Sequence, residues 1–246
     1  MPSDRYQAQE KWRFWGPEGQ DKLRRARVLI VGCGGLGGHQ ANLLARAGVG
    51  FLRLIDADQP DLSNLHRQIL FDETDLDSPD GKAIIAAERL RWVNSEISIE
   101  GVEARFSAAN ADSWIKDVDL VLDASDNFPT RFALNRACVA RKKPWIYGGV
   151  VGATGMALNI FPGAGPCLQC LYPEEPPADQ IPTSQNTGIV NTAPAIIAAL
   201  QVNEAFKILL GDPAVTRELV QIDLWQLSFA ATRIARSEQC PVCGKL

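Results

Sequence analysis

The sequence has few histidines, no long apolar run and no excess of basic residues. Only His39 and His66 occur among 246 residues, and we expect both to be structural or surface residues. Uninterrupted apolar stretches such as Ala193–Leu200 are far shorter than the roughly 18 residues that span a bilayer, so we expect no membrane segment. With 25 basic and 29 acidic residues the net charge is −4, which argues against a nucleic-acid-binding protein.

The start of the chain lacks the features of a secretion signal. Its first 27 residues mix basic and acidic side chains, and no apolar segment follows the start, so we expect a cytoplasmic protein. Cysteines in that compartment are more often metal ligands or nucleophiles than disulfides. The 46% of hydrophobic residues excludes a disordered chain and is typical of a globular protein.

Short apolar runs alternate with segments of helical spacing. We predict strands over 27–31, 51–55, 97–102, 118–122, 145–150 and 157–161, and helices over 40–47, 82–93, 131–141 and 193–210. Strands that alternate with helices indicate an α/β fold with a doubly wound, Rossmann-like sheet that is mainly parallel. Residues 219–227 and 230–236 predict a closing antiparallel hairpin, and the Pro-rich stretch 172–187 predicts a long connection.

No repeat, low-complexity tract or Gly/Ser linker divides the sequence. At roughly 150 residues per domain the length allows one large domain or two small ones, and we expect a single domain over residues 1–246. It comprises an N-terminal arm (1–26), a core (27–160), and a C-terminal part (161–246) with a crossover loop, a long helix, a hairpin and a metal clasp.

A glycine-rich loop follows the first predicted strand. Gly32-Cys-Gly-Gly-Leu-Gly37 has the pattern G-x-G-x-x-G, in which glycines let backbone N–H groups approach a phosphate at a helix N-terminus. Asp56 ends the second strand, where a carboxylate can bind ribose hydroxyls. These features predict a nucleotide in the core and leave NAD and ATP open, although the loop is no Walker A motif because Gly-Lys-Ser/Thr is missing.

The stretch after Asp56 favours a triphosphate. Ser63-Asn-Leu-His-Arg-Gln68 follows within about a dozen residues, and Gly81-Lys82 comes shortly after. Arginine can bind phosphate through two parallel hydrogen bonds and lysine acts as a mobile point charge. Arg67 and Lys82 therefore suit the higher charge of ATP, although either alone is more often a solvated surface cation.

Four of the six cysteines form two Cys-x-x-Cys pairs. Cys167, Cys170, Cys240 and Cys243 have the spacing of a four-thiolate tetrahedral zinc site, and a redox motif would normally occur only once. Because all four positions would be filled by thiolates, we expect a structural Zn²⁺ clasp made of four cysteines and no catalytic metal there. Cys33 and Cys138 are expected to be packing residues.

Taken together, these motifs resemble the ThiF/MoeB/HesA family, bacterial relatives of the ubiquitin-activating enzymes. The resemblance rests on the glycine loop, Asp56-Ala-Asp58, residues 63–68, Asp123-Ala-Ser-Asp-Asn127 and the two cysteine pairs. It implies ATP-dependent adenylation of a small ubiquitin-like sulfur-carrier protein (MoaD- or ThiS-like) that ends in Gly-Gly. It also implies a homodimer, for which Trp12, Trp15 and the helix over 193–210 are candidate interface residues.

The resemblance also implies roles for individual residues. Asp126 would hold Mg²⁺, and Arg67, Lys82 and Asp126 would be the catalytic residues. Asp123 would be a support residue; without the resemblance, Asp123 and Asp126 are equally well explained as turn and cap residues. The nucleotide-binding set would comprise Gly32, Gly34, Gly35, Gly37, Asp56, Asp58, Asn64, Arg67, Gln68, Lys82, Asp126 and Asn127.

Two positions depart from the family pattern. The family's N-terminal pattern is Arg-Tyr-x-Arg-Gln, and its second arginine reaches the ATP site of the neighbouring subunit. This chain has Ala8 in place of that arginine. Arg5, Lys11 and Arg13 are candidates to compensate. Where some members carry a nucleophilic cysteine this chain has Ser184, so we expect the reaction to stop at the acyl-adenylate. A non-catalytic scaffold of the same fold and an NAD-dependent oxidoreductase are the alternatives.

Overall fold

The computed structural model describes residues 4–177, 181–184 and 186–245. Its strands are β1 (Arg27–Val31), β2 (Phe51–Asp56), β3 (Ser98–Glu103), β4 (Leu120–Asp123), β5 (Trp145–Val151), β6 (Thr154–Ile160), β7 (Leu219–Asp223) and β8 (Ser228–Thr232). Its α-helices are α1 (Gln7–Glu10), α2 (Gly16–Arg25), α3 (Gly35–Ala47), α4 (Lys82–Val93), α5 (Ala111–Ile115), α6 (Phe128–Ala140), α7 (Leu168–Leu171) and α8 (Thr192–Leu210). Short 3-10 turns occur at Asp4–Tyr6, Leu62–Asn64 and Glu73–Asp75.

These strands form one sheet in the order β3-β2-β1-β4-β5-β6-β7-β8. The first five run parallel, and β6, β7 and β8 continue the sheet in antiparallel orientation. The predicted doubly wound α/β fold with a C-terminal antiparallel extension is therefore confirmed. The carboxyl ends of β1, β2 and β4 meet at one edge of the sheet, where such folds bind their ligands.

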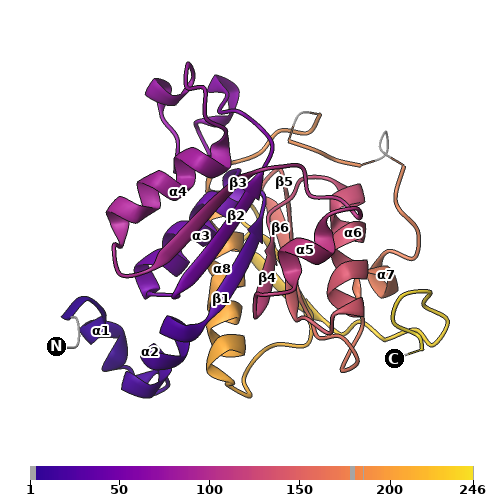
Figure 1. Ribbon diagram of the computed structural model, residues 1–246. Helices are drawn as coiled ribbons and strands as arrows, with labels where there is room; N and C mark the ends of the chain where they lie inside the picture. Colours follow the sequence, from indigo (N-terminus) through magenta and orange to yellow (C-terminus); the bar gives the residue numbers. More distant parts are fainter. Residues whose placement is uncertain (1–3, 178–180, 185, 246) are drawn as a thin grey trace.

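Helices cover both faces of the sheet, with α5 and α6 in front and α3 and α8 behind (Figure 1). Side chains along β1 alternate between these layers, as the pleat requires. Val28 and Ile30 belong to the core shared with α3, α4 and α8, whereas Leu29 and Val31 belong to the core shared with α5 and α6.

Helix α8 is the one helix of the described residues that is long and apolar enough to cross a membrane. It packs against α3, β5 and β6 and carries the buried polar residues Gln201 and Glu204. Both side chains have hydrogen-bond partners inside the fold, as Gln201 Nε2 donates to Ile146 O and Glu204 Oε2 accepts from Asn159 Nδ2. It is the core helix of this α/β fold.

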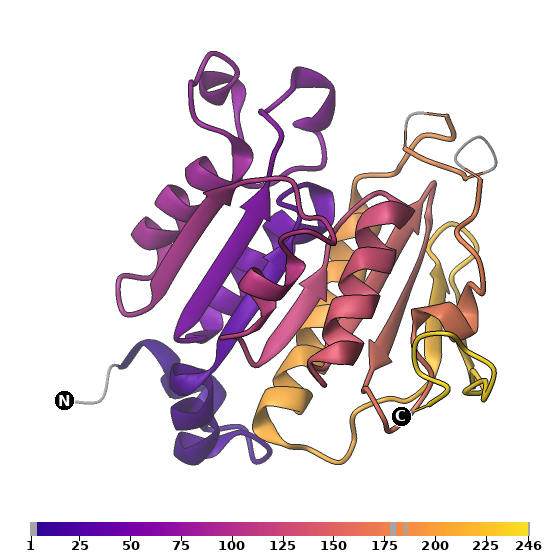
Figure 2. The ribbon, with the colours of Figure 1, turned by 45° about the vertical axis from the view of Figure 1, so that its right-hand side comes forward.

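The N-terminal arm folds against the lower end of α8 (Figure 2). Trp15 packs edge-on against Phe206 of α8 with ring centroids 4.9 Å apart, so its ring is partly covered within the chain. Trp12 and Phe14 remain 55% and 53% exposed. Tyr6 is buried, and its hydroxyl accepts a hydrogen bond from Asn94 Nδ2 at 2.8 Å.

Several predicted boundaries shift. The helix predicted over 40–47 begins at Gly35, because the glycine loop supplies its first turn. It ends at Gly48, whose φ is +83° and whose Cβ would lie 2.6 Å from the Tyr6 ring, so glycine is required there. The predicted hairpin is shorter, since the chain leaves the sheet after Thr232. Part of the connection over 172–187, namely 178–180 and 185, lies outside the described residues, and α5 and α7 were not predicted.

Candidate functional site

The glycine loop is pressed against the segment that follows β4. Gly32 has φ +100°, and a Cβ there would lie 2.6 Å from the carbonyl oxygen of Ala124. A Cβ on Gly37 would lie 1.9 Å from the carbonyl oxygen of Gly32. Both positions therefore exclude any other residue, and the loop leads directly into the first turn of α3, whose N–H groups have no helical acceptor. Such a turn is suited to a phosphate.

Asp56 connects this loop to the end of β2. Its Oδ2 accepts a hydrogen bond from the Cys33 N–H at 2.6 Å, and its Oδ1 accepts one from the Asp58 N–H at 2.8 Å. Burial raises the pKa of the Asp56 carboxyl, and these two hydrogen bonds oppose that rise. The carboxylate is held in one orientation beside the loop.

Lys82 approaches the same place from the first residue of α4. Its N–H donates to Asp58 O at 2.9 Å, and its buried Nζ lies 3.8 Å from Asp58 Oδ2. Cys33 is buried, as predicted for a packing residue, and burial raises the pKa of its thiol far more than the nearby Lys82 charge lowers it.

Arg67 and Gln68 close the other side of the glycine loop. A Cβ on Gly35 would lie 3.5 Å from Arg67 O, and one on Gly34 would lie 3.4 Å from Gln68 Nε2. The guanidinium of Arg67 donates from Nη2 to Asn64 Oδ1 at 2.5 Å. Partial burial lowers the pKa of Arg67, and the charge of Asp126 acts in the opposite direction.

Gln68 has an unsatisfied acceptor. Its side chain is buried, and Oε1 has no hydrogen-bond partner within the described part of the chain. A buried amide oxygen without a partner costs free energy, so a ligand hydroxyl or amine that donates to it is favoured. This unsatisfied oxygen belongs to the side chain whose Nε2 lies beside Gly34, and it fits a nucleotide bound at the loop.

Asp126 and Asn127 follow β4 at the same edge. The Asp126 side chain is exposed, and its Oδ1 accepts a hydrogen bond from Asn127 Nδ2 at 3.2 Å. Asn127 also caps α6, because its Oδ1 accepts from the Thr130 N–H at 2.9 Å. The exposed Asp126 carboxylate can bind a hard cation, whereas the Asn127 side-chain oxygen is already used to cap α6.

A buried ion pair that was not predicted supports this segment. Arg131 Nε lies 3.2 Å from Asp123 Oδ2, and Arg131 Nη2 donates to Ser125 O at 2.7 Å. Asp123 Oδ1 accepts from the Ser125 N–H and hydroxyl. Burial raises the pKa of Asp123 and the Arg131 charge counteracts it. The available signal was an arginine one turn after the Asn127 cap.

Two glutamines brace the same segment from behind the sheet. Gln201 Nε2 donates to Asp123 O at 3.0 Å, and Gln40 Nε2 donates to Gln201 Oε1 at 2.7 Å. Gln201 is the first polar residue after the apolar run of the predicted helix, which could have indicated its position. Its partner, 161 residues away, could not be identified from local sequence.

The four predicted cysteine ligands lie together, and all are free thiols. Their sulfur atoms lie within 4.8 Å of one another, with 3.6 Å between Cys167 and Cys240 and 3.5 Å between Cys170 and Cys243. A tetrahedral zinc ion at about 2.3 Å from each sulfur separates the sulfurs by about 3.8 Å, so the cluster fits a four-thiolate metal site. Asn135 Nδ2 and the Ser237 N–H lie 3.6 and 3.5 Å from Cys167 and Cys170 Sγ, as outer-shell donors.

The departures from the family pattern can also be located. Ala8 is exposed on α1, and Arg5 is engaged at the end of α4, where it donates to Val93 O and pairs with Glu96 at 3.5 Å. Arg5 is therefore committed to anchoring the arm. Lys11 and Arg13 are exposed, and Ser184 is half-buried in the connection before α8.

Comparison with known proteins agrees with this arrangement. Residues 6–242 match the ThiF family. The sulfur carrier protein adenylyltransferase of Thermus thermophilus is 37% identical and covers 98% of this chain and 90% of its own length. The sulfur carrier protein ThiS adenylyltransferase of Bacillus subtilis is 38% identical, and the match covers 98% of this chain and 71% of the relative. The structure of E. coli MccB with ATP has a TM-score of 0.80 at 26% identity, and the match covers 92% of this chain and 69% of the MccB chain. The chain thus belongs to the ThiF family.

Proposed function

We propose that this chain is an ATP-dependent adenylyltransferase that activates the C-terminal Gly-Gly carboxylate of a small ubiquitin-like sulfur-carrier protein. The relatives in T. thermophilus and B. subtilis are named for the adenylation of sulfur carriers. The observation that carries the proposal is the convergence of the glycine loop, Asp56, Lys82 and Arg67 at one edge of the sheet.

The reaction brings two anions together. An oxygen of the carrier's C-terminal carboxylate attacks the α-phosphorus of ATP, the bond from that phosphorus to the bridging β-phosphate oxygen breaks, and pyrophosphate leaves. The product is an acyl-adenylate. No general base is needed, because a C-terminal carboxyl with a pKa of about 3.5 is ionised at neutral pH. The protein has to align the reactants and offset their charge.

The backbone of the loop and the carboxylates after β2 suit the nucleoside part and the phosphates. Gly32, Gly34, Gly35 and Gly37 form the loop that would approach the phosphates, and Asp56 with Asp58 would bind the ribose hydroxyls. Support comes from the fixed orientation of Asp56 and from the unsatisfied Gln68 oxygen beside the loop.

The cations and the exposed carboxylate suit the reacting phosphates. Asn64, Arg67 and Lys82 would hold the triphosphate and offset the charge that develops as pyrophosphate leaves. Asp126, with Asn127 beside it, would hold Mg²⁺. A bound Mg²⁺ supplies positive charge to phosphate oxygens. The exposure of Asp126 and the effect of its charge on Arg67 support this assignment.

The remaining assignments concern the chain as a whole. The cysteine cluster would hold a structural Zn²⁺, since four thiolates leave no open coordination position. The continuous eight-stranded sheet supports a single domain over residues 1–246. We also propose that the protein is a cytoplasmic homodimer, in which the exposed Trp12 and Phe14 would contact the second subunit. Ser184 in place of a thiol supports a reaction that ends at the acyl-adenylate.

The alternatives are not favoured. An NAD-dependent oxidoreductase does not account for Lys82 and Arg67 beside the loop, nor for relatives that are adenylyltransferases. A non-catalytic scaffold would bind ATP without turnover, and an ATP–pyrophosphate exchange assay distinguishes it from an active enzyme.

ATP–pyrophosphate exchange tests the proposal. The purified chain is incubated with ATP, Mg²⁺, labelled pyrophosphate and each small ubiquitin-like protein of the source organism that ends in Gly-Gly. We expect exchange with at least one of these carriers and none when its last two glycines are deleted. ATP binding without exchange for every carrier would support the scaffold and overturn the proposed activity.

A further inference from the structure

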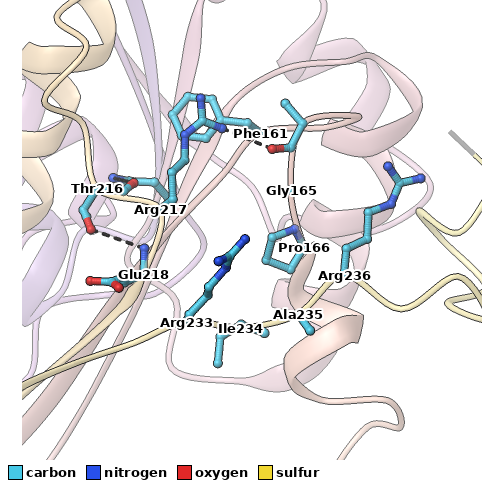
Figure 3. Close-up of a pocket in the computed structure, with 12 residues that line it drawn as sticks. Phe161, Gly165, Pro166, Thr216, Arg217, Glu218, Arg233, Ile234, Ala235 and Arg236 are labelled. Carbon is cyan, nitrogen blue, oxygen red and sulfur yellow. Dashed lines mark hydrogen bonds between the residues drawn. The ribbon is translucent and has the colours of Figure 1, made fainter.

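A cavity lies at the opposite edge of the sheet from the glycine loop. β6 runs antiparallel to β5, so its end at Ile160 lies at the edge where the parallel strands begin. The cavity, of about 730 Å³, is open to solvent and lies between three segments, 159–166, 216–218 and 233–236 (Figure 3). Arg217 and Arg233 in its lining are exposed. This volume is within the range of small-molecule sites, roughly 300–1,000 Å³.

Among the charged residues of the lining, arginines predominate. It contains Arg217, Arg233 and Arg236, with Glu218 as the one acid among the lining residues. Figure 3 shows the guanidinium of Arg233 directed into the cavity and the carboxylate of Glu218 directed away from it. Within the described residues, neither Arg217 nor Arg233 forms an ion pair. The charges of Arg217 and Arg233 are thus not neutralised by ion pairs within these parts of the chain.

Two of the arginines are held in place by contacts with other parts of the chain. The guanidinium of Arg217 stacks on the Phe161 ring at 4.1 Å from its centroid and donates to Ala164 O at 3.3 Å. Arg236 Nη2 donates to Cys243 O at 2.6 Å. A side chain that is already ordered loses less conformational entropy when a ligand binds, which favours binding.

We propose that this cavity binds an organic anion with a carboxylate or phosphate group next to an apolar part. A guanidinium matches two oxygens of such a group through parallel hydrogen bonds, and Arg233 is placed to make them. Phe161, Pro166 and Ile234 give apolar wall for the rest of the ligand. The site is independent of the proposed adenylation.

Ligand titrations followed by NMR test this site in the full-length, metal-loaded protein. Phenyl phosphate and benzoate are added separately to ¹⁵N-labelled protein, with benzyl alcohol as the neutral counterpart. We expect saturable shifts of backbone amides in 164–165, 216–218 and 233–236 with at least one anion and none with benzyl alcohol. The two anions separate a phosphate site from a carboxylate site.

Matched variants assign the binding to the cavity. Arg233→Gln should weaken binding about tenfold or more, because it removes the charge-assisted hydrogen bonds. Arg25→Gln, at an exposed arginine on α2, should leave the affinity unchanged. An unchanged melting temperature of Arg233→Gln confirms that this variant is folded; if it is not, Arg217→Gln replaces it.

Three outcomes would overturn the proposal. The first is the absence of saturable shifts with either anion. The second is equal affinity in the Arg233→Gln and wild-type proteins. The third is shifts confined to the amides of 33–37, which would place the anion at the glycine loop instead.

Discussion

Asn135 of α6 contacts Cys167 and its neighbour through both ends of its side chain. Its Nδ2 lies 3.6 Å from Cys167 Sγ, and its Oδ1 accepts a hydrogen bond from the N–H of the next residue, Leu168, at 3.1 Å. The same helix begins at the cap Asn127 and carries Arg131 one turn later. One rigid element therefore joins the cysteine cluster to the segment that carries Asp126.

Removal of the cysteine-bound metal is expected to destabilise the whole chain. The cluster ties the C-terminal segment to the region between β6 and α8, so metal binding contributes to the free energy of folding. A loss of about 4 kcal/mol would lower the melting temperature by roughly 10 °C in a domain of this size. Calorimetry before and after chelation measures this, and metal analysis should find one zinc per chain.

Asn135→Ala is expected to weaken the cluster without removing a ligand. The substitution leaves the buried Cys167 sulfur and the Leu168 N–H without their partner, at a cost of about 1–3 kcal/mol. Zinc release to a chromogenic chelator should be faster than in wild type. Asn42→Ala, which removes an exposed contact to Arg46, is the matched control and should release zinc at the wild-type rate.

Lys82→Ala is expected to lower ATP–pyrophosphate exchange about 100-fold, because a buried cation beside the glycine loop is lost. Lys116→Ala, at an exposed lysine, should retain full exchange. Lys82→Arg keeps the charge but changes its geometry, so an intermediate rate is expected. Wild-type exchange in Lys82→Ala would exclude Lys82 from the site.

Arg131→Met is expected to destabilise the fold by about 3–5 kcal/mol, because it leaves the buried Asp123 carboxylate without its cation. The loss should depend on pH. Burial already raises the pKa of Asp123, and removal of Arg131 raises it further, so protonation at lower pH relieves the penalty. Urea unfolding at about pH 8 and about pH 5.5 should show the larger difference from wild type at the higher pH; an equal difference would contradict the assignment.

Asp117 is expected to stabilise the fold above about pH 4 and to lose this effect in strong acid. Hydrogen bonds and charge from Arg53, then Arg27, lower the pKa of Asp117 to about 2. A carboxyl with a lowered pKa stabilises the fold above its unfolded value of about 3.9, and loses that effect as the pH falls towards about 2. Because the site is partly exposed, Asp117→Asn should cost only about 1 kcal/mol at neutral pH. The difference from wild type should shrink between about pH 4 and about pH 2.

The family and most of the secondary structure were accessible from sequence, because their signals are local. Helix 82–93 was predicted with the observed bounds, and strand 27–31 likewise, since apolar spacing and flanking glycines act over a few residues. The Cys-x-x-Cys spacing likewise predicted a cluster whose sulfur atoms lie within 4.8 Å of one another. The glycine loop, Asp56, Arg67 and Lys82 were proposed from residue patterns, and the other candidate ligands of ATP from the resemblance. The roles of all these residues stay predictions.

The sequence by itself determined the order of strands and helices, the glycine loop and the four thiols. The tertiary structure alone decided which distant residues support them. Arg131 pairs with Asp123, Gln40 reaches Gln201, and three arginines line a cavity at the opposite edge of the sheet. Local patterns follow from the chemistry of neighbouring residues, whereas these contacts depend on how the strands align in the sheet and how the helices pack on its faces.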